Sequence, residues 1–145
     1  MIISDFTQLS ICLNVNRIVI VTLVKNYNDF YVKYSHYGKK LEKAIKLLEN
    51  KCIKLHKFSP SGREIWTVVG KEGDQLVDGS QPYCSCKYFY YKVLSGKDDI
   101  CYHLLGLIIA KQISAYDIIE FQDHEYASFL KNLLRDIVKI SEIDY

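Results

Sequence analysis

The pattern of hydrophobic and polar positions predicts three helices around a small group of strands. In residues 39–50 the apolar positions recur with the spacing of one helix face, at Leu41, Ala44, Ile45 and Leu48. Residues 102–112 carry apolar side chains around most of a helix circumference, so the helix predicted there is central. A last amphipathic helix is predicted from about Asp123, as its N-cap, to about Ile140.

Shorter alternating runs predict strands between the first two helices. Residues 52–58 and 63–69 flank Ser59-Pro60-Ser61-Gly62, in which proline presets φ early in a turn and glycine accepts a positive φ later. We therefore predict a β-hairpin over 52–69. A third strand is predicted from about Gln75 toward Tyr83, and a β-branched run over 17–24 predicts another strand near the start.

Composition and charge exclude few classes of protein. The 145 residues are 49% hydrophobic and 25% charged, and their net charge of +2 is too small to argue for nucleic acid by itself. The charge is uneven, with eight basic and two acidic residues in 39–63 against three basic and seven acidic in 114–145. No signal peptide is visible, and the apolar stretch 11–24 is shorter than the roughly 20 residues of a membrane span. We expect an intracellular protein with no membrane contact.

Two tight pairs of soft ligands carry the strongest chemical signal. Cys84 and Cys86 end the third predicted strand, and Cys101 and His103 begin the central helix, with fourteen residues between the pairs. Zinc prefers four such ligands in a tetrahedron, and a helix N-terminus favours thiolate over thiol. We predict a closed structural Zn2+ site made of these four residues. The plainer alternative is three coincidental buried thiols and a core histidine.

These residues carry a resemblance to a known family. Cys84-x-Cys86, Phe89 and Cys101-x-His103-Leu104-Leu105 resemble the SWIM-type zinc finger, C-x-C…C-x-H. The preceding helix and the hairpin with Ser59-Pro60-Ser61-Gly62-Arg63 resemble, in the same order, the small stand-alone SWIM subunit of the Shu recombination complex. The likeness covers about residues 31–113. Lys87 and Tyr102 depart from the residues common in SWIM fingers, but neither is a ligand.

The predicted helices and strands, with the metal site, favour an α+β fold: a small antiparallel sheet, a zinc-clipped ββα finger and flanking helices. We expect one domain over 1–145. Its parts are an N-terminal segment 1–38, a region 39–113 with helix, hairpin and finger, and a C-terminal helix 114–145. The resemblance implies a non-catalytic adaptor that partners a RecA-type recombinase paralogue in homologous recombination and DNA repair, in the cytoplasm, nucleoid or nucleus. Single-stranded DNA would be reached weakly or through that partner. The alternative is a free-standing nucleic-acid-binding zinc protein.

Several surfaces are candidates for these partners. Apolar residues that one small sheet would leave uncovered suggest a protein-binding surface at 18–30, or around Phe129 and Leu133. Phosphate contacts would come from the basic middle of the chain, at Lys43, Lys46, Lys54 and Lys57. Three tyrosines around Phe89 fit base stacking, packing under the finger, or a protein contact equally well; they are Tyr88, Tyr90 and Tyr91. Trp66 and His56 are expected to pack on the hairpin.

Overall fold

The computed structural model describes residues 28–29, 31–71 and 73–142. The chain divides into two units, Met1–His36 and Tyr37–Tyr145, and the sheet and the candidate site belong to the second. The elements, in chain order, are η1 (Ser35–Tyr37), α3 (Lys39–Glu49), β1 (Ile53–Ser59), β2 (Arg63–Val68), β3 (Gln75–Asp78), β4 (Tyr83–Cys84), η2 (Phe89–Val93), α4 (Tyr102–Ile113), β5 (Asp117–Gln122), η3 (Asp123–Glu125) and α5 (Tyr126–Glu142).

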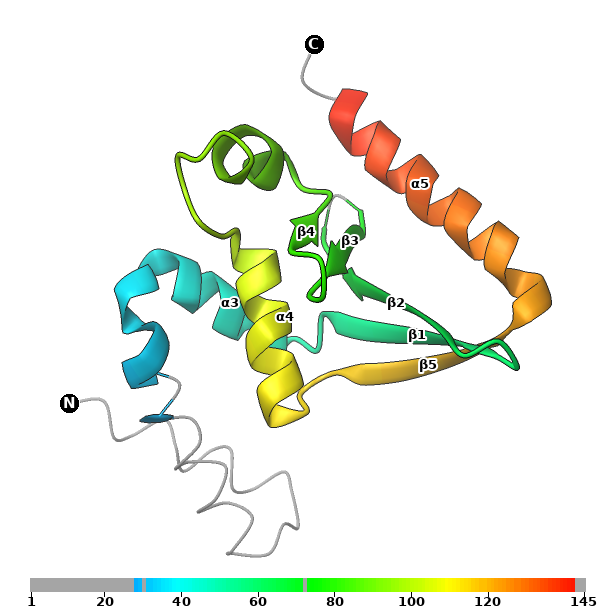
Figure 1. Cartoon of the computed structure of the whole chain (residues 1–145), viewed down its shortest axis with the longest axis horizontal. Coiled ribbons are helices and arrows are strands. Elements are labelled where there is room, and N and C mark those ends of the chain that lie inside the picture. Colours follow the sequence, from blue (N-terminus) through cyan, green and yellow to red (C-terminus); the bar gives the residue numbers. More distant parts are fainter. Residues whose placement is uncertain (1–27, 30, 72, 143–145) are drawn as a thin grey trace, which may run out of the picture. The chain divides into compact units, whose positions relative to one another are not determined.

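The five strands form one sheet in the order β4-β3-β2-β1-β5 (Figure 1). The predicted hairpin is confirmed, since β1 and β2 pair antiparallel with Leu55 opposite Trp66, and Gly62 takes the positive φ (73°) that the turn requires. The pairs β2–β3 and β3–β4 are antiparallel as well. The α+β class is therefore confirmed.

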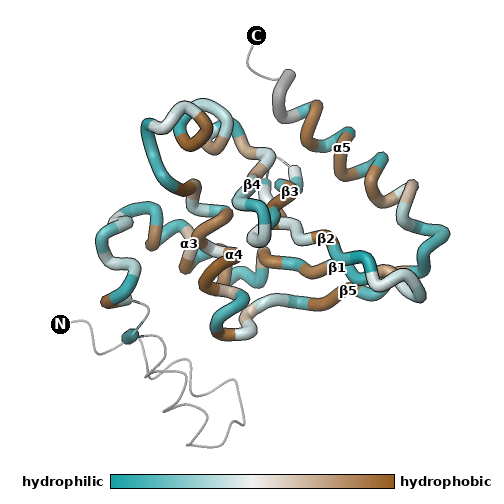
Figure 2. Tube along the Cα trace, viewed as in Figure 1, coloured by the Kyte–Doolittle hydropathy of each residue, from teal (hydrophilic) through white to brown (hydrophobic). Residues whose placement is uncertain are grey.

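The two faces of the sheet pack against different helices. Side chains alternate along a strand, so Ile53 and Leu55 of β1 share one face while His56 and Phe58 share the other. The first face lies against α4, whose apolar residues stand out in Figure 2. The second face lies against α5, because the ring of Phe129 is 4.5 Å from that of His56 and 5.5 Å from that of Phe58. Leu133, one turn further along α5, is also buried.

A single glycine lets α4 approach α3 closely. A Cβ at Gly106 would lie 3.2 Å from Leu47 Cδ1 on α3 and 3.6 Å from Ile53 Cδ1 on β1. Seven of the twelve α4 residues are buried, which confirms the prediction of a central helix. α3 covers α4 with Leu41 and Ala44, so the predicted amphipathic helix is confirmed too.

The structure corrects two expectations about the sheet and adds a helical turn after Cys86. The sheet is mixed rather than antiparallel, because β5 adds to β1 in the parallel direction. The third predicted strand is in fact two, β3 and β4, since Asp78 accepts hydrogen bonds from the backbone and hydroxyl of Ser80 and turns the chain. The polar loop after Cys86 contains the π-helical turn η2.

The C-terminal region also differs from its prediction. Residues 117–122 form β5, an element that the sequence pattern did not predict, because the adjacent Ile118 and Ile119 break the alternation of a strand. The helix α5 then begins at Tyr126 after the short turn η3, and Gln122, rather than the predicted Asp123, is the N-cap residue of that turn. Asp123 instead accepts hydrogen bonds from the backbone N–H and the hydroxyl of Ser61 in the β1–β2 turn.

Some expectations lie outside the described residues. They are the strand predicted over 17–24 and, apart from residues 28 and 29, the surface predicted over 18–30. Among the described residues, no helix combines the length and apolarity needed to span a membrane.

His56 is a buried titratable group between the sheet and α5. Its side chain packs on the hairpin as predicted, with 6% of the residue exposed and Nε2 within 2.9 Å of Thr67 Oγ1. Its Nδ1 is buried and has no hydrogen-bond partner among the described residues. Burial lowers the pKa of His56, and the positive charge of Lys54 lowers it further. The structure therefore favours the neutral imidazole.

This burial predicts a specific pH dependence of folding. The pKa of His56 is below the roughly 6.5 of an unfolded histidine, so between these two values the unfolded chain binds the proton more readily. The contribution of His56 to stability is complete above about pH 6.5 and falls with acidification toward the lowered pKa. Urea unfolding from pH 7.5 to 5.0 should show a loss of on the order of 1 kcal/mol per pH unit inside that window.

The matched variant is His56→Gln, which has no titrating group at this position. Every other titrating group is present in both proteins, so its effect cancels in the difference between their unfolding free energies. Parallel pH profiles for the wild type and His56→Gln would contradict the prediction.

Candidate metal centre

The four predicted ligands come together where the sheet meets α4. Cys84 lies on β4, Cys86 follows two residues later, and Cys101 and His103 lie at the start of α4. One donor atom from each lies within 4.8 Å of every other donor atom, and all four residues are buried. The two halves of the sequence motif, separated by fourteen residues, thus form one compact group.

Hydrogen bonds to β3 set the path of the chain through the first pair. Cys84 is opposite Val77 in the β3–β4 pair, which places its side chain on the face that α4 covers. Ser85 then donates its N–H to the carbonyl of Leu76, and its hydroxyl accepts the N–H of Leu76 and donates to Gln75 Oε1. These bonds tie the turn to β3, so Cys86 follows in a defined position.

The start of α4 presents the second pair. Cys101 is the N-cap, with extended backbone angles (φ −89°, ψ 160°), and its carbonyl accepts the N–H of Leu105 at 3.0 Å. His103 is the second residue of the helix, and the neighbouring Tyr102 ring lies 3.9 Å from its imidazole. An extended residue followed by a helical turn lets side chains two positions apart converge on the same point.

The donor set fits a zinc ion. Tetrahedral bonds of about 2.3 Å to sulfur and 2.0–2.1 Å to nitrogen place a sulfur and a nitrogen roughly 3.6 Å apart. Cys84 Sγ and His103 Nδ1 are 3.8 Å apart, so Nδ1 is the nitrogen that faces the thiols. Three thiols and one imidazole are a common structural zinc set, and four protein donors complete a tetrahedron without a water position.

The electrostatics of the thiols also favour a cation. Hydrogen bonds from Cys101 and Cys84 lower the pKa of Cys86, and its sulfur also accepts the backbone N–H of Phe89 at 3.3 Å. The hydrogen bonds with Cys101 and Cys86 raise the pKa of Cys84. One thiolate is thus favoured while its neighbours stay protonated, because buried negative charges repel each other at short range. A divalent cation removes this restriction and stabilises all three thiolates.

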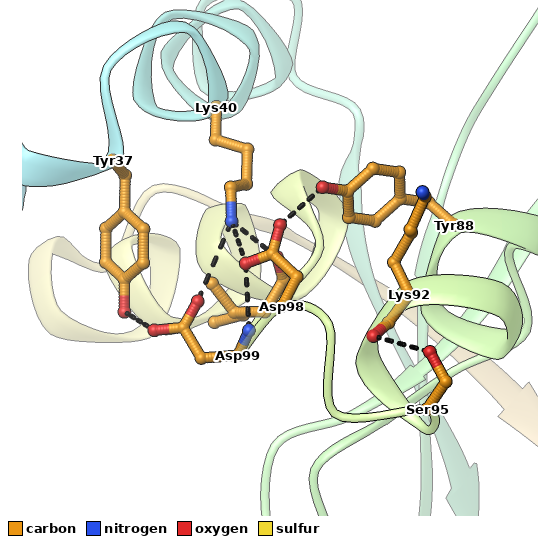
Figure 3. A network of polar contacts seen from close by, with 8 residues as sticks. Tyr37, Lys40, Tyr88, Lys92, Ser95, Asp98 and Asp99 are labelled. Atoms are coloured by element: carbon orange, nitrogen blue, oxygen red, sulfur yellow. Dashed lines mark hydrogen bonds and ion pairs between the residues drawn. The ribbon is translucent and has the colours of Figure 1, made fainter.

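Residues 87–100, here called the finger loop, connect the two ligand pairs and are held to α3 by a polar network (Figure 3). Lys40 on α3 lies 2.5 Å from Asp98 Oδ1, contacts Asp99 at 3.7 Å, and donates to the carbonyl of Ile100 at 3.0 Å. Tyr88 donates to Asp98, and Tyr37 donates to Asp99. The network ends one residue before the ligand Cys101.

The pKa directions show which contact dominates this network. Burial opposes the charge of Lys40, but the hydrogen bond and charge of Asp98 outweigh it and raise the pKa of Lys40. The hydrogen bond from Lys40, followed by that from Tyr88, holds the pKa of Asp98 well below its usual range. No local spacing in the sequence predicts this pairing, because Lys40 and Asp98 are 58 positions apart.

The four lysines proposed to contact phosphates do not form one patch. Lys43 and Lys46 are exposed on α3. Lys54 and Lys57 lie three apart on β1 and so point to opposite faces, and each has an acidic partner, Asp117 at 2.5 Å and Glu64 at 3.3 Å. Phosphate binding by these residues stays a prediction, and the ion pairs favour Lys43 and Lys46 for it.

Phe129 and Leu133, the two residues proposed for partner binding, lie on the side of α5 that packs against the sheet. Phe129 is half-buried against His56 and Phe58, and Leu133 is 6% exposed. The sheet covers them because the side chains on its second face need an apolar layer. The outer surface of the same helix instead exposes Leu134 and Val138, at 51% and 52%.

Comparison with known proteins finds relatives that are named for a SWIM zinc finger, the motif that the four donors resemble. The chain is similar to the Zinc finger SWIM domain-containing protein 7 homolog of Dictyostelium discoideum, with 36% identity over 89 residues, 59% of this chain and 56% of that protein. Zinc finger SWIM domain-containing protein 7 of Mus musculus is 28% identical over 103 residues (70% and 67%), and that of Homo sapiens 29% over 96 residues (65% and 68%). The chain therefore spans little more than half of the first relative.

No family model matches the chain, and no solved structure matches it.

The fold and the site define a class of protein, one with a C-x-C pair at the end of a β-hairpin and a C-x-H pair at the start of a helix on an α+β scaffold. The resemblance to SWIM-type zinc finger proteins is confirmed by relatives that carry that name. The chain is therefore similar to SWIM-type zinc finger proteins in both its sequence and its group of four donors.

The site predicts one zinc ion per chain and a fold that depends on it. Cys101→Ala should lose the zinc and lower the melting temperature by about 10 °C or more, because structural zinc contributes folding free energy directly. Plasma mass spectrometry of the purified protein measures the metal, and X-ray absorption should give sulfur near 2.3 Å. The matched control is Cys52→Ala, a cysteine outside the group, which should keep both the metal and the melting temperature. Full zinc retention in Cys101→Ala would refute the ligand set.

The network of Figure 3 predicts a measurable coupling between α3 and the finger loop. In a double-mutant cycle, Lys40→Met and Asp98→Asn should show a coupling free energy of about 1 kcal/mol, which falls as NaCl is raised, because the pair is only partly shielded from solvent. Urea unfolding measures the four proteins. Lys39→Met changes the neighbouring exposed lysine and should show no coupling to Asp98→Asn. An equal coupling free energy of Lys39 and Lys40 with Asp98 would mean that the coupling reflects the overall charge of α3 rather than the contact between Lys40 and Asp98.

Proposed function

We propose that the chain is a non-catalytic adaptor that partners a RecA-type recombinase paralogue in homologous recombination and DNA repair. The observation that carries the proposal is the four-donor Cys3His group in the SWIM arrangement, together with relatives named for a SWIM domain. The recombinase partner comes from the resemblance to the stand-alone SWIM subunit of the Shu recombination complex. Such a protein acts within the cell, in the nucleus of a eukaryote or near the nucleoid of a prokaryote.

The chemistry of the centre supports a structural rather than a catalytic role. Catalytic zinc keeps one coordination position open for water or substrate, and a structural site is closed by four protein ligands. The four donors here lie within 4.8 Å of one another and are buried, so a bound zinc would be enclosed. The metal would then hold β4 against α4 and present the surfaces around them.

The outer surface of α5 offers apolar contacts for such a partner. Leu134 and Val138 are four residues apart, so they lie one above the other on the helix, and each is about half exposed. Protein interfaces depend on a few apolar anchors that salt hardly weakens. We therefore assign the partner-binding role to this surface, in place of Phe129 and Leu133.

The test is co-purification of the tagged full-length chain with a RecA-type paralogue from its native cell, at 0.1 M and about 0.5 M NaCl. The complex should survive the higher salt, since the Debye length there is only a few ångströms and apolar contacts do not depend on it. Leu134→Asp combined with Val138→Asp should reduce recovery of the paralogue at least tenfold, because two charges are placed in an apolar contact.

Asn132→Asp is the matched control, since it adds a negative charge at another exposed position of α5. It should leave recovery unchanged, and all variants should keep their zinc and their melting temperature. No paralogue recovered with the wild-type chain would refute the proposed partner. Equal recovery with the Leu134 and Val138 variants would move the interface elsewhere.

A further inference from the structure

The finger loop exposes an unusual concentration of aromatic surface. Phe89 is 3% exposed and anchors the loop, with its ring 5.7 Å from that of Tyr83. The next two residues, Tyr90 and Tyr91, are 64% and 63% exposed, and Leu94 is 64% exposed. The rings of Tyr90 and Tyr91 meet edge to face, with their centres 5.0 Å apart. Apolar surface gathered in this way is typical of a binding site.

The charge of the same loop is uniformly positive over residues 87–97. This stretch, KYFYYKVLSGK, contains three lysines and no acidic residue. The two acidic residues that follow, Asp98 and Asp99, are directed toward Lys40 and Tyr37 on the α3 side, as Figure 3 shows. Lys40 balances one of these two negative charges on the α3 side, and Lys92 and Lys97 remain exposed beside the tyrosines.

A cavity continues this positive surface toward α3. Its volume is about 210 Å³, and it is lined by Lys39, Lys40, Lys43, Tyr88 and Tyr102. Lys43 lies over the Tyr102 ring with its ammonium group 5.5 Å from the ring centre, so its position is defined by a cation–π contact. Tyr88 belongs to the cavity and to the finger loop, which makes the two features one continuous surface.

We propose that this surface binds single-stranded nucleic acid. Tyr90 and Tyr91 stack on two unpaired bases, Lys92 and Lys97 contact the phosphates beside them, and the lysine cavity takes a further phosphate. Proteins that bind single strands combine exposed aromatic rings with a positive track in this manner. A duplex buries the faces of its bases in its own stack, so the exposed rings favour a single strand. This contact belongs to the chain itself and goes beyond the proposed adaptor function, because it does not require the recombinase partner.

Fluorescence anisotropy of a labelled 20-residue oligothymidylate, titrated with the zinc-loaded full-length chain, tests the proposal. The wild type should bind with a salt slope of about −2 to −3 in log–log form, as three or four phosphate contacts to a single strand predict. Tyr90→Ala and Tyr91→Ala should each weaken binding roughly fivefold or more, and Tyr90→Phe should not. Lys92→Gln should reduce the magnitude of the slope by about 0.7. Oligouridylate in place of oligothymidylate shows whether a 2′-hydroxyl contributes, and tight binding of either strand supports the proposal.

Matched controls separate the finger loop from general effects. Tyr31→Ala removes a tyrosine outside the loop that is 45% exposed, and Lys131→Gln removes an exposed lysine on α5; both should bind like the wild type. Equal affinity for a 20-base-pair duplex, or equal losses in the controls, would overturn the proposal. So would a Tyr90→Ala, Tyr91→Ala variant that keeps its affinity for oligothymidylate but fails to recover the protein partner, since the loop would then be a protein interface. Loss of binding with partner recovery intact leaves the adaptor proposal untouched, so the two proposals fail separately.

Discussion

The burial of three thiols and an imidazole at one point is the constraint on which the rest of this structure depends. Cys84, Cys86, Cys101 and His103 lie between the last β-hairpin and the central helix α4, within 4.8 Å of one another. Buried ionised groups are costly without a compensating partner, and like charges at this distance cannot all ionise unaided. A bound zinc ion would resolve both problems and would cross-link two elements that are separated by the finger loop. Such a link would hold the start of α4 against β4.

Packing contacts connect the group of four donors to α3 and to the exposed finger loop. Gly106 allows α3 to approach α4, and Lys40 of α3 reaches Asp98 in the finger loop just before the ligand Cys101. The loop is therefore fixed at both ligand pairs and in between, by Phe89 in the core and by the network of Figure 3. A loop held in this way can expose tyrosines without folding over them. Its order lowers the entropy that must be lost when it binds a partner.

Four protein donors would leave a bound zinc no open coordination position, so both proposals rest on surfaces of the chain. The chain has two such surfaces of different chemistry, the apolar outer side of α5 and the basic aromatic finger loop. Contacts of the first kind are insensitive to salt and suit a lasting protein complex, whereas contacts of the second kind weaken as salt rises and suit a transient hold on nucleic acid. An adaptor between a recombinase paralogue and a single strand would need both.

The sequence by itself determined the features that depend on local spacing. The ligand quartet, the β1–β2 hairpin and the helices α3 and α4 were predicted from residues close together in the chain, because helical periodicity, turn residues and paired ligands are local properties. Only the tertiary structure decided that residues 117–122 form β5, since that strand exists through its parallel pairing with β1. The same holds for Leu133, which is covered by the second face of the sheet, and for Lys40, whose partner is 58 positions away. Contacts between distant segments depend on how the elements meet in space, and no spacing along the chain records that.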